Sequence, residues 1–485
     1  MVSRIIKHEW RVLVTDKLLW ILLPVYAALI GYGVYNGVSW VRFQEQTIAA
    51  ARTQADSTIA NLKTTTASIE HGGIAPPPYE DPRDAGLVSR GLGYEFATLP
   101  PSSMAPLAIG QSDLLPYYYR VTRRALDEFL NTDEIENPLN LAGGRFDLGF
   151  VITYLYPLLI LALSYNLLSV EREQGTQSLL LSQPVSVRQW VTGKIILRGS
   201  VIFGAAVTLS VLAFLLSGVS LASGESLLRF FVWIVVLAGY GAFWFGLAIL
   251  VNSLGFKSST NALALMASWL FFVLLVPCLL NVLAKTVYPT PSRIELVQAL
   301  RSADAQNSQE NSKMMTGSRE TESSVPAYGD DADANTKIAL TEFYRAMLRA
   351  EQRSETARAT ILARFERQIA SQQSFVRRFR FASPVIVTQS AITELAGTGA
   401  ARFEHFNAAV RQFHLAWRAF FDPKIMQDNR VTAVEYESLP RFQYVEEPLA
   451  AVIRRGLGDL VPLLVLAAAS LLLGFSWLRR YRVVG

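Results

Sequence analysis

Histidine, the side chain that proteins use most often to bind transition metals, occurs only four times among the 485 residues, at positions 8, 71, 405 and 414. His405 and His414 are nine residues apart in a segment with helical periodicity, so they face different directions on the expected helix. His8-Glu9 lacks the second histidine of a His-Glu-x-x-His zinc motif, and we interpret it as a surface pair. A shared metal site is therefore not expected.

Nucleotide binding and nucleophilic catalysis also lack their usual motifs. Gly193-Lys194 is followed by Ile195 and has no preceding glycines, so it is not a loop that cradles the phosphates of ATP. The Gly-x-Ser-x-Gly pattern of serine hydrolases is absent. The single cysteine, Cys278, lies in an apolar segment, where we expect an inert core residue. We therefore expect no enzyme active site and no bound cofactor in this chain.

The segment most informative about function is Glu171-Arg-Glu-Gln-Gly-Thr-Gln-Ser-Leu-Leu-Leu-Ser-Gln-Pro184, which directly follows a long apolar block. The charges at Glu171, Arg172 and Glu173 end that block, because a bilayer interior cannot solvate them cheaply. The segment therefore marks the point at which the chain leaves the membrane.

The rest of this segment has the signals of a short surface helix. Gly175 and Thr176 can turn the chain and cap the helix, and Pro184 ends it. Its apolar face is formed by Leu179, Leu180 and Leu181. This face favours a contact with another protein, although an ordinary interfacial helix between two membrane spans explains the same pattern.

The composition is that of an all-α membrane protein. Hydrophobic residues make up 51% of the chain and charged residues 18%, and apolar blocks alternate with long polar regions. A helix needs about 20 residues to cross a hydrocarbon core. Six blocks meet this requirement: Leu18–Trp40, Leu148–Val170, Ile196–Ser217, Phe230–Val251, Ala262–Ala284 and Leu457–Leu478.

The orientation follows from the lysines and arginines close to these spans, which collect on the cytoplasmic side. With six spans, four basic segments share one side: Arg4 to Lys17, Arg172 to Arg198, Lys257, and Arg479 to Arg482. Both termini are therefore predicted in the cytoplasm and regions 41–146 and 285–448 outside it. Arg454 and Arg455, at the outer start of the last span, count against the rule. This topology explains the net charge of +5 better than binding to nucleic acid does.

Before the first span, apolar residues recur at helical spacing. They are Val2, Ile5, Ile6, Trp10 and Leu13, with Arg4, Lys7 and Arg11 on other faces. This pattern predicts an amphipathic helix on the inner leaflet. A secretory signal is the less favoured interpretation, because the apolar run is too long and no small-x-small cleavage site follows it closely.

The two outer regions are expected to be mainly helical. Val41–Glu70 reads as a helix that continues from the first span, and Tyr117–Leu130 as a second helix. Ala303–Asn335 is polar and is expected to be a mobile loop. Ile338–Phe381 and Val385–Phe421 again have helical spacing, and we interpret the aromatic stripe of the latter as core packing rather than a ligand site. These regions have no repeat.

The central parts of all six spans lack ionisable residues, although ion-coupled carriers usually place such residues within the membrane. Asp147, Arg198, Arg229 and Asp459 are near span ends. The energy for any movement therefore has to come from a partner. Gly33-x-x-x-Gly37, near the end of the first span, is a weak motif that permits a close contact with another helix.

Taken together, the sequence resembles the membrane subunits of ABC-2 type transporters. The features that match are the amphipathic N-terminal helix, six spans, a hairpin of spans three and four, and the Glu171-Arg-Glu-x-Gly-Thr176 run with its following leucines and Pro184. The large outer regions differ from typical members and are similar to a bacterial subgroup with extended extracytoplasmic insertions. The resemblance covers most of the chain.

This resemblance implies a fold and a division of the chain. The fold is that of the ABC-2, or type V exporter-like, permeases. The implied parts are an amphipathic helix and first span (1–40), the first extracytoplasmic region (41–146), spans two to five with a cytoplasmic coupling region at 171–190 (147–284), the second extracytoplasmic region (285–448), and the last span with a cytoplasmic C-terminus (449–485).

The resemblance also implies partners. The Glu171–Pro184 run would dock on a separate ABC ATPase, which binds the ATP, and a second permease, identical or related, would complete a dimer in the bacterial cytoplasmic membrane, surrounded by lipid. The function implied is substrate translocation, in the export direction. The alternative is mechanotransmission, in which ATP-driven motion acts on an extracytoplasmic protein and no solute crosses. A membrane-embedded enzyme or receptor is the least favoured interpretation, since no catalytic constellation is present.

Overall fold

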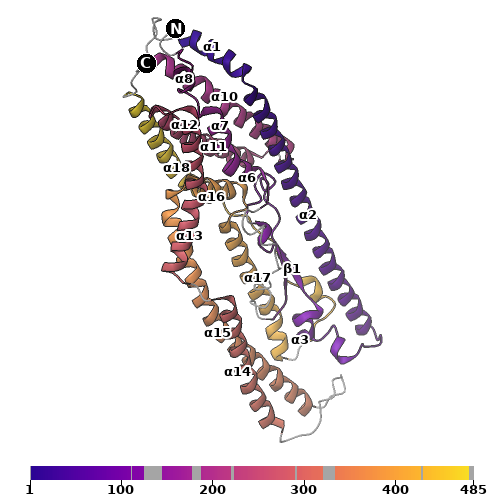
Figure 1. The fold of residues 1–485 in the computed structure, drawn as a ribbon. Helices are drawn as coiled ribbons and strands as arrows, with labels where there is room; N and C mark the ends of the chain where they lie inside the picture. The colour runs from indigo at the N-terminus through magenta and orange to yellow at the C-terminus, as the bar shows by residue number, and fades with distance from the viewer. Residues whose placement is uncertain are drawn as a thin grey trace.

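The computed structural model describes residues 2–110, 112–124, 145–176, 187–219, 223–289, 292–319, 334–427 and 430–479. Long helices dominate it and form an elongated molecule, with a helical bundle at one end and a second, distal domain at the other (Figure 1). The N-terminal helix α1 (Val2–Thr15) and the C-terminal end of α18 (Leu449–Leu478) lie at the same end of the bundle (Figure 1). The predicted predominance of helix is confirmed.

Among the described residues, five helices are long and apolar enough to cross a membrane. They are Lys17–Glu70 (α2), Gln189–Leu216 in α10 (Val187–Leu216), Gly224–Ser253 (α11), Ser258–Val287 (α12, a π turn and α13) and Leu449–Leu478 (α18). The block expected as the second of six spans forms a shorter apolar helix, Leu148–Ser164. It consists of α6 (Leu148–Phe150), a π turn at Val151–Leu155 and α7 (Tyr156–Ser164).

Several of these helices begin before the apolar blocks that predict them. α10 begins nine residues before Ile196, and α18 eight residues before Leu457. Two charged residues of these early turns, Lys194 and Arg455, are paired within the bundle. Arg455, which counted against the expected orientation, lies within α18, and its Nε is 2.9 Å from Glu394 Oε2. Charge alone therefore does not locate these helix starts.

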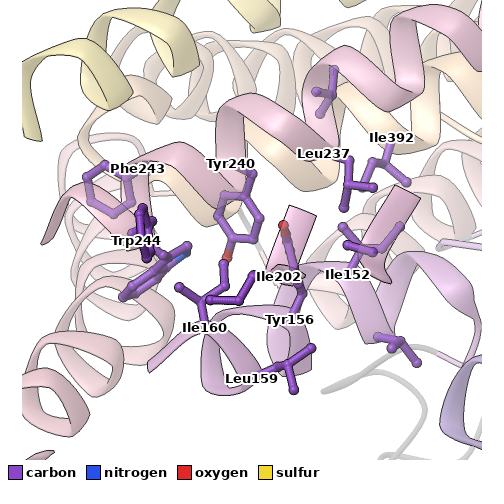
Figure 2. Packing of buried hydrophobic residues seen from close by; sticks show 14 of the residues in the cluster. Ile152, Tyr156, Leu159, Ile160, Ile202, Leu237, Tyr240, Phe243, Trp244 and Ile392 are labelled. Carbon is purple, nitrogen blue, oxygen red and sulfur yellow. The ribbon is translucent and has the colours of Figure 1, made fainter. Parts of the chain in front are cut away.

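The centre of the bundle is α11. Of its most apolar stretch 67% is buried, against 17% for that of Ser258–Val287. Figure 2 shows Tyr240 and Trp244 of α11 facing Tyr156 and Ile160 of α7. The Tyr240 hydroxyl donates to the carbonyl oxygen of Thr153 over 2.7 Å, so the buried ring also satisfies its polar atom.

The segment Ser258–Val287 lies on the surface of the bundle. α12 (Ser258–Leu270) and α13 (Val276–Val287) are joined by a π turn, Phe271–Leu275, and carry many exposed apolar side chains. Cys278 of α13 is exposed, so its predicted place in the core is wrong. Such a surface suits a lipid environment.

The short helix α16 (Pro384–Ala396) belongs to the core of the bundle and not to a separate core. It packs between α11 and α18, and Val387, Ala391 and Leu395 are fully buried there. Gly397 ends it with a φ of 72°, a conformation that favours glycine. The apolar stripe predicted over Val385–Phe421 is thus divided between two helices in different parts of the molecule.

The helix α2 (Lys17–Glu70) connects the bundle to the distal domain without interruption (Figure 1). Its 54 residues correspond to about 80 Å at the rise of an α-helix. The Asp16 side chain caps its start by accepting from the Leu18 backbone N–H over 2.9 Å. The predicted continuation of the first span through Val41–Glu70 is confirmed.

The distal domain has a core of its own around α17 (Ala400–Gln427). Phe406, Val410, Trp417 and Phe421 of this helix are buried, which confirms that the aromatic stripe is packing. They pack against α3 (Ala85–Leu87) and an antiparallel pair of strands, β1 (Glu95–Thr98) and β2 (Tyr118–Val121), in which Glu95 pairs with Val121.

The helix predicted at Tyr117–Leu130 is wrong over its first part, because residues 118–121 pair with β1. Residues 125–130 lie outside the described part of the chain. The rings of Tyr119 and Phe406 stack with centroids 5.7 Å apart, a long-range contact that favours the strand over local helical preference.

The remaining helices, α14 (Arg293–Arg319) and α15 (Ala334–Phe379), form an extended pair that descends along the other side of the molecule (Figure 1). α15 confirms the helix expected over Ile338–Phe381. The loop expected at Ala303–Asn335 is wrong as far as Arg319, because α14 continues through it, and residues 320–333 are outside the described ranges.

Candidate functional site

The charged run after α7 forms a single helical turn, α8 (Val170–Glu173), at the end of the bundle where α1 lies (Figure 1). Gly175 adopts a φ of 69°, which reverses the chain, and the Thr176 backbone N–H donates to the Glu171 carbonyl oxygen over 2.9 Å. The expected turn at Gly175 and Thr176 is therefore present. Leu179, Leu180, Leu181 and Pro184 lie outside the described residues, so their packed face stays a prediction.

Glu171 is tied to the interior of the bundle. Its carboxylate forms an ion pair with the ammonium of Lys194 on α10, and only 2% of the Lys194 side chain is exposed. The same Nζ donates to the carbonyl oxygen of Leu167 over 3.0 Å. A buried ammonium needs such partners, since its desolvation is costly. Glu171 is thus a bracing residue and not a free surface charge.

The N-terminal helix joins the same cluster through Glu9. The Arg198 Nε donates to Glu9 Oε1 over 2.9 Å, and the Lys194 Nζ is 3.8 Å from Glu9 Oε2. Only 4% of the Glu9 side chain is exposed, so the surface interpretation of His8-Glu9 is wrong for Glu9. The helices approach closely here, because a Cβ at Gly193 would lie 2.8 Å from the Ile5 Cγ2.

The cluster also explains why the second apolar block forms a short helix. The last carbonyl groups of a helix lack partners within it. Here Arg198 Nη1 donates to Leu163 O, and Asn252 Nδ2 of α11 donates to Ser164 O, each over 3.0 Å. With Lys194 on Leu167, these side chains end the helix inside the bundle, and the two cations interact favourably with its dipole.

Glu173 connects α8 to the start of α12. Its carboxylate accepts from the Ser258 backbone N–H over 2.5 Å and from the Ser258 hydroxyl over 3.0 Å. These hydrogen bonds lower the pKa of the Glu173 carboxyl, although the side chain is exposed. A carboxylate at a helix N-terminus satisfies an amide that has no partner within the helix.

Arg172 differs from its two neighbours. Its side chain is half-buried, and among the described residues its guanidinium forms neither a hydrogen bond nor an ion pair. We call the set Glu9, Glu171, Glu173, Lys194 and Arg198 the terminal junction. Of the three charges of the run, Glu171 and Glu173 brace this junction, and Arg172 has no hydrogen bond or ion pair with its members.

The sequence predicts Glu171 and Glu173 as contacts to an ATPase, which stays a prediction, and it did not reveal their partners within the bundle. Lys194 and Arg198, which the sequence places in a loop, are both buried on α10. The spacing of residues in α1 could have identified Glu9. It is four residues from both Ile5 and Leu13, which places an acid on the apolar stripe of this helix. A charge on a buried stripe indicates a buried partner.

A second polar cluster lies at the opposite end of the short helix, toward the distal domain. Asp147 is buried and caps α6, with Phe150 N donating to Oδ1 over 2.6 Å and Ile109 N to Oδ2 over 2.7 Å. Gly33 and Gly37 of α2 face this region. A Cβ at Gly37 would lie 1.9 Å from Pro106 O, and one at Gly33 would lie 2.8 Å from Asp147 C.

We call Asp147, the loop 102–110, Gly33 and Gly37 the distal junction. The α16 end joins it, because the Thr398 hydroxyl donates to Ala108 O over 2.8 Å. The close contact expected of the two glycines is present, but with a loop and a helix start. Nearby, Asp459 of α18 accepts from the Ser390 hydroxyl over 2.8 Å and lies 2.7 Å from Arg380 Nη2.

Metal ligands are not grouped in the described part of the chain: no three His, Cys, Asp or Glu residues there are placed to hold one ion. His405 and His414 instead contact backbone carbonyls, of Val445 at 3.1 Å and of Arg124 at 2.8 Å. These residues have structural contacts in the distal domain.

Part of the chain is similar to a known protein family. Residues 293–445 match the family model of a domain of unknown function, DUF3526. The matched segment contains α14 to α17, and it covers less than half of the chain. No curated protein matches the chain.

Proposed function

We propose that this chain is the membrane-spanning subunit of an ABC-2 type transporter, driven by a separate ABC ATPase that docks at the terminal junction. The chain would lie in the bacterial cytoplasmic membrane with both termini in the cytoplasm, paired with a second permease. The observation that carries the proposal is the bracing of the Glu171-Arg-Glu run to α10 and α12, with α1 joined to the same cations of α10 through Glu9.

Because of these contacts, a movement of α8 would be transmitted to specific helices. Glu171 would pass it to α10 through Lys194, and Glu173 would pass it to α12 through Ser258. Glu9 links the same cation pair to α1, whose Val14 carbonyl oxygen accepts from Trp20 Nε1 of α2 over 2.7 Å. ATP can shift the bundle only if the ATPase binds its two conformations with different affinity.

The division of labour within the run follows from its contacts. Glu171 and Glu173 hold α8 in place, so Arg172 is the charge available to an ATPase surface. The leucines Leu179, Leu180 and Leu181 would add the apolar part of that contact. We expect acidic groups on the ATPase opposite Arg172.

The movement of a substrate, in the export direction, is the principal form of this proposal. Mechanotransmission is the second, and the continuity of α2 favours it. A helix of 54 residues that starts beside the terminal junction and ends in the distal domain would carry a tilt of the bundle directly to that domain. An extracytoplasmic protein would then be the recipient.

Co-expression and co-purification with an ABC ATPase from the same organism tests the docking role. We expect Arg172→Glu to lower ATPase recovery and ATP hydrolysis strongly, with an unchanged melting temperature of the isolated chain. Arg454→Glu, at an exposed arginine near the other end of the bundle, is the matched control. Glu171→Ala and Glu173→Ala should lower both assembly and stability. If none of these variants changes assembly or hydrolysis, the docking role is wrong.

A distance measurement separates transport from mechanotransmission. Spin labels at Ser57 of α2 and Arg364 of α15, both exposed, report on the width of the distal domain in a Cys278→Ser background. Mechanotransmission predicts a change in this distance when ATP binds the complex. An unchanged distance, together with ATP-dependent release of solute from vesicles, would favour transport.

A further inference from the structure

An apolar groove with a cavity volume of about 350 Å³ lies between α2, α7 and α12. Leu22 and Tyr26 of α2, Leu159 of α7, and Leu265 and Met266 of α12 form its walls. Its size is at the lower end of the range for small-molecule sites, and its lining is almost entirely hydrocarbon. Neither the charge cluster nor the proposed ATPase contact uses this groove.

The groove lies near the end of the bundle that holds the terminal junction, which we call the terminal end. Its α2 residues begin five positions after the start of that helix at Lys17, and its α12 residues begin four positions after Ser258. Its α7 residues lie within the last ten positions before Ser164. At 1.5 Å per residue, the groove therefore occupies roughly the first 20 Å from this end, the depth of one lipid leaflet.

Basic side chains flank the groove on the side of the membrane surface. Lys17 precedes Leu22 by five residues, and Lys257 precedes Ala262 by the same number, so both walls carry an exposed lysine about 7 Å closer to the surface. Two carboxylates near these lysines could neutralise their charge, but both accept hydrogen bonds from backbone N–H groups. Asp16 is engaged in capping α2 and Glu173 in binding Ser258.

The exposed face of α1 adds further positive charge at this end. Lys7 and Arg11 are exposed, whereas Glu9, the acid between them, is buried in the terminal junction. The acidic charge of α1 is therefore neutralised internally while its basic charge remains at the surface. A hydrocarbon groove below a basic surface is complementary to one class of molecule, an anionic amphiphile.

We propose that this groove binds an acyl chain of an anionic phospholipid from the leaflet at the terminal end, with the headgroup at the level of Lys17 and Lys257. The acyl chain fills the space between α2 and α12, which the described side chains leave open. The headgroup phosphate meets the lysines, and an uncharged headgroup gains no such contact. The proposal requires a bilayer but no ATPase.

The test uses the full-length chain in detergent and fluorescent phosphatidylglycerol or phosphatidylcholine of the same acyl composition. We expect saturable binding with a preference for phosphatidylglycerol. Ala262→Leu narrows the groove and should weaken this saturable binding, while Ala267→Leu, at an exposed alanine on the same helix outside the groove, should leave it unchanged.

A double substitution of the two lysines tests the proposed contact with the lipid headgroup. Lys17→Gln combined with Lys257→Gln should reduce the preference for phosphatidylglycerol by about 30-fold, the factor expected for two surface lysines. Lys285→Gln, an exposed lysine at the far end of α13, should not change it. Because both changes are at exposed side chains, they leave the bundle core intact.

Three outcomes would overturn the proposal. These are equal binding of the two lipids by the wild-type chain, unchanged phosphatidylglycerol binding by Ala262→Leu, and an interchain disulfide formed by Val25→Cys in a Cys278→Ser background. The last would show that a second copy of the chain covers the groove. Loss of ATPase assembly in the Arg172 variant would not affect these results, so the two proposals fail separately.

Discussion

The terminal and distal junctions hold opposite ends of the same short helix, and they are built differently. The terminal junction joins three helices through side-chain ion pairs, Glu9 with Arg198 and Glu171 with Lys194. The distal junction joins α2 to a loop through backbone contacts at Gly33 and Gly37, around a single carboxylate, Asp147. One junction depends on charge balance and the other on the absence of side chains.

This difference bears on how each junction can respond. Ion pairs can exchange partners, and the Lys194 ammonium already lies near both Glu9 and Glu171, so the terminal junction can be rearranged by a new charge. Backbone contacts at glycine have no alternative partner. We therefore expect the terminal junction to switch and the distal junction to move as a rigid unit with α2.

The largest effect is expected from removing one charge of the terminal junction. Glu9→Ala leaves Arg198 buried without its carboxylate and should reduce the free energy of unfolding by about 3–5 kcal/mol. Chemical denaturation in detergent measures it. Glu45→Ala, an exposed acid on α2, is the control and should cost less than about 0.5 kcal/mol. Equal effects of the two changes would mean that the ion pairs do not hold this junction.

The next effect is a steric one at the distal junction. Gly37→Ala places a Cβ 1.9 Å from Pro106 O and should destabilise the chain by about 1–3 kcal/mol, because backbone must shift. Gly31→Ala, on the same helix with nothing within 4 Å, is its control. It should be neutral or stabilising by up to about 1 kcal/mol, as alanine is the better helix former. If both variants melt alike, the close packing of α2 is wrong.

A smaller effect is expected from removing a helix cap, and it should differ between Asp147 at the distal junction and Asp16 at the start of α2. Asp147→Ala removes a buried cap that accepts three backbone N–H groups, from Phe150, Ile109 and Gly110, and should cost about 2 kcal/mol. Asp16→Ala removes a cap with one such bond, to Leu18, and should cost about 0.5–1 kcal/mol. The order of the two melting temperatures is the measurement, and the reverse order would contradict the account of the distal junction.

The smallest effect is a pH dependence at the terminal junction. The pKa of Glu173 is lowered in the folded chain by its hydrogen bonds from Ser258. A depressed folded pKa gives stability that is present above the unfolded pKa and is lost as pH falls through the folded pKa. Wild type should therefore melt slightly above Glu173→Gln at neutral pH, and the difference should vanish in acid. A difference that grows on acidification would contradict this contact.

The sequence was sufficient to predict the parts of the fold that depend on local pattern. The continuous helix Lys17–Glu70 and the buried stripe of α17 follow from apolar spacing over many turns. The apolar helices follow from hydropathy. Their starts do not, because Arg455 and Lys194 form ion pairs with carboxylates of other segments, Glu394 and Glu171.

Long-range contacts explain what the sequence did not reveal. The strand Tyr118–Val121 depends on pairing with Glu95–Thr98, and the short apolar helix ends at Ser164 because Asn252 and Arg198 cap it from other helices. In the candidate site, the type and position of Glu171 and Glu173 single them out, but not their contacts with Lys194 and Ser258. Glu9 was missed because a residue in a charged N-terminal segment is usually solvated.

Photo-crosslinking at Gln174 tests the central claim most directly. Gln174 is exposed, next to Arg172 and Glu173 and before the turn at Gly175. A photoreactive residue there, in cells that express the chain, should capture a protein with an ATP-binding cassette, identified by mass spectrometry, and one at the exposed Val445 of the distal domain should not. Failure to capture such a protein at Gln174, or capture at Val445 instead, would contradict the account.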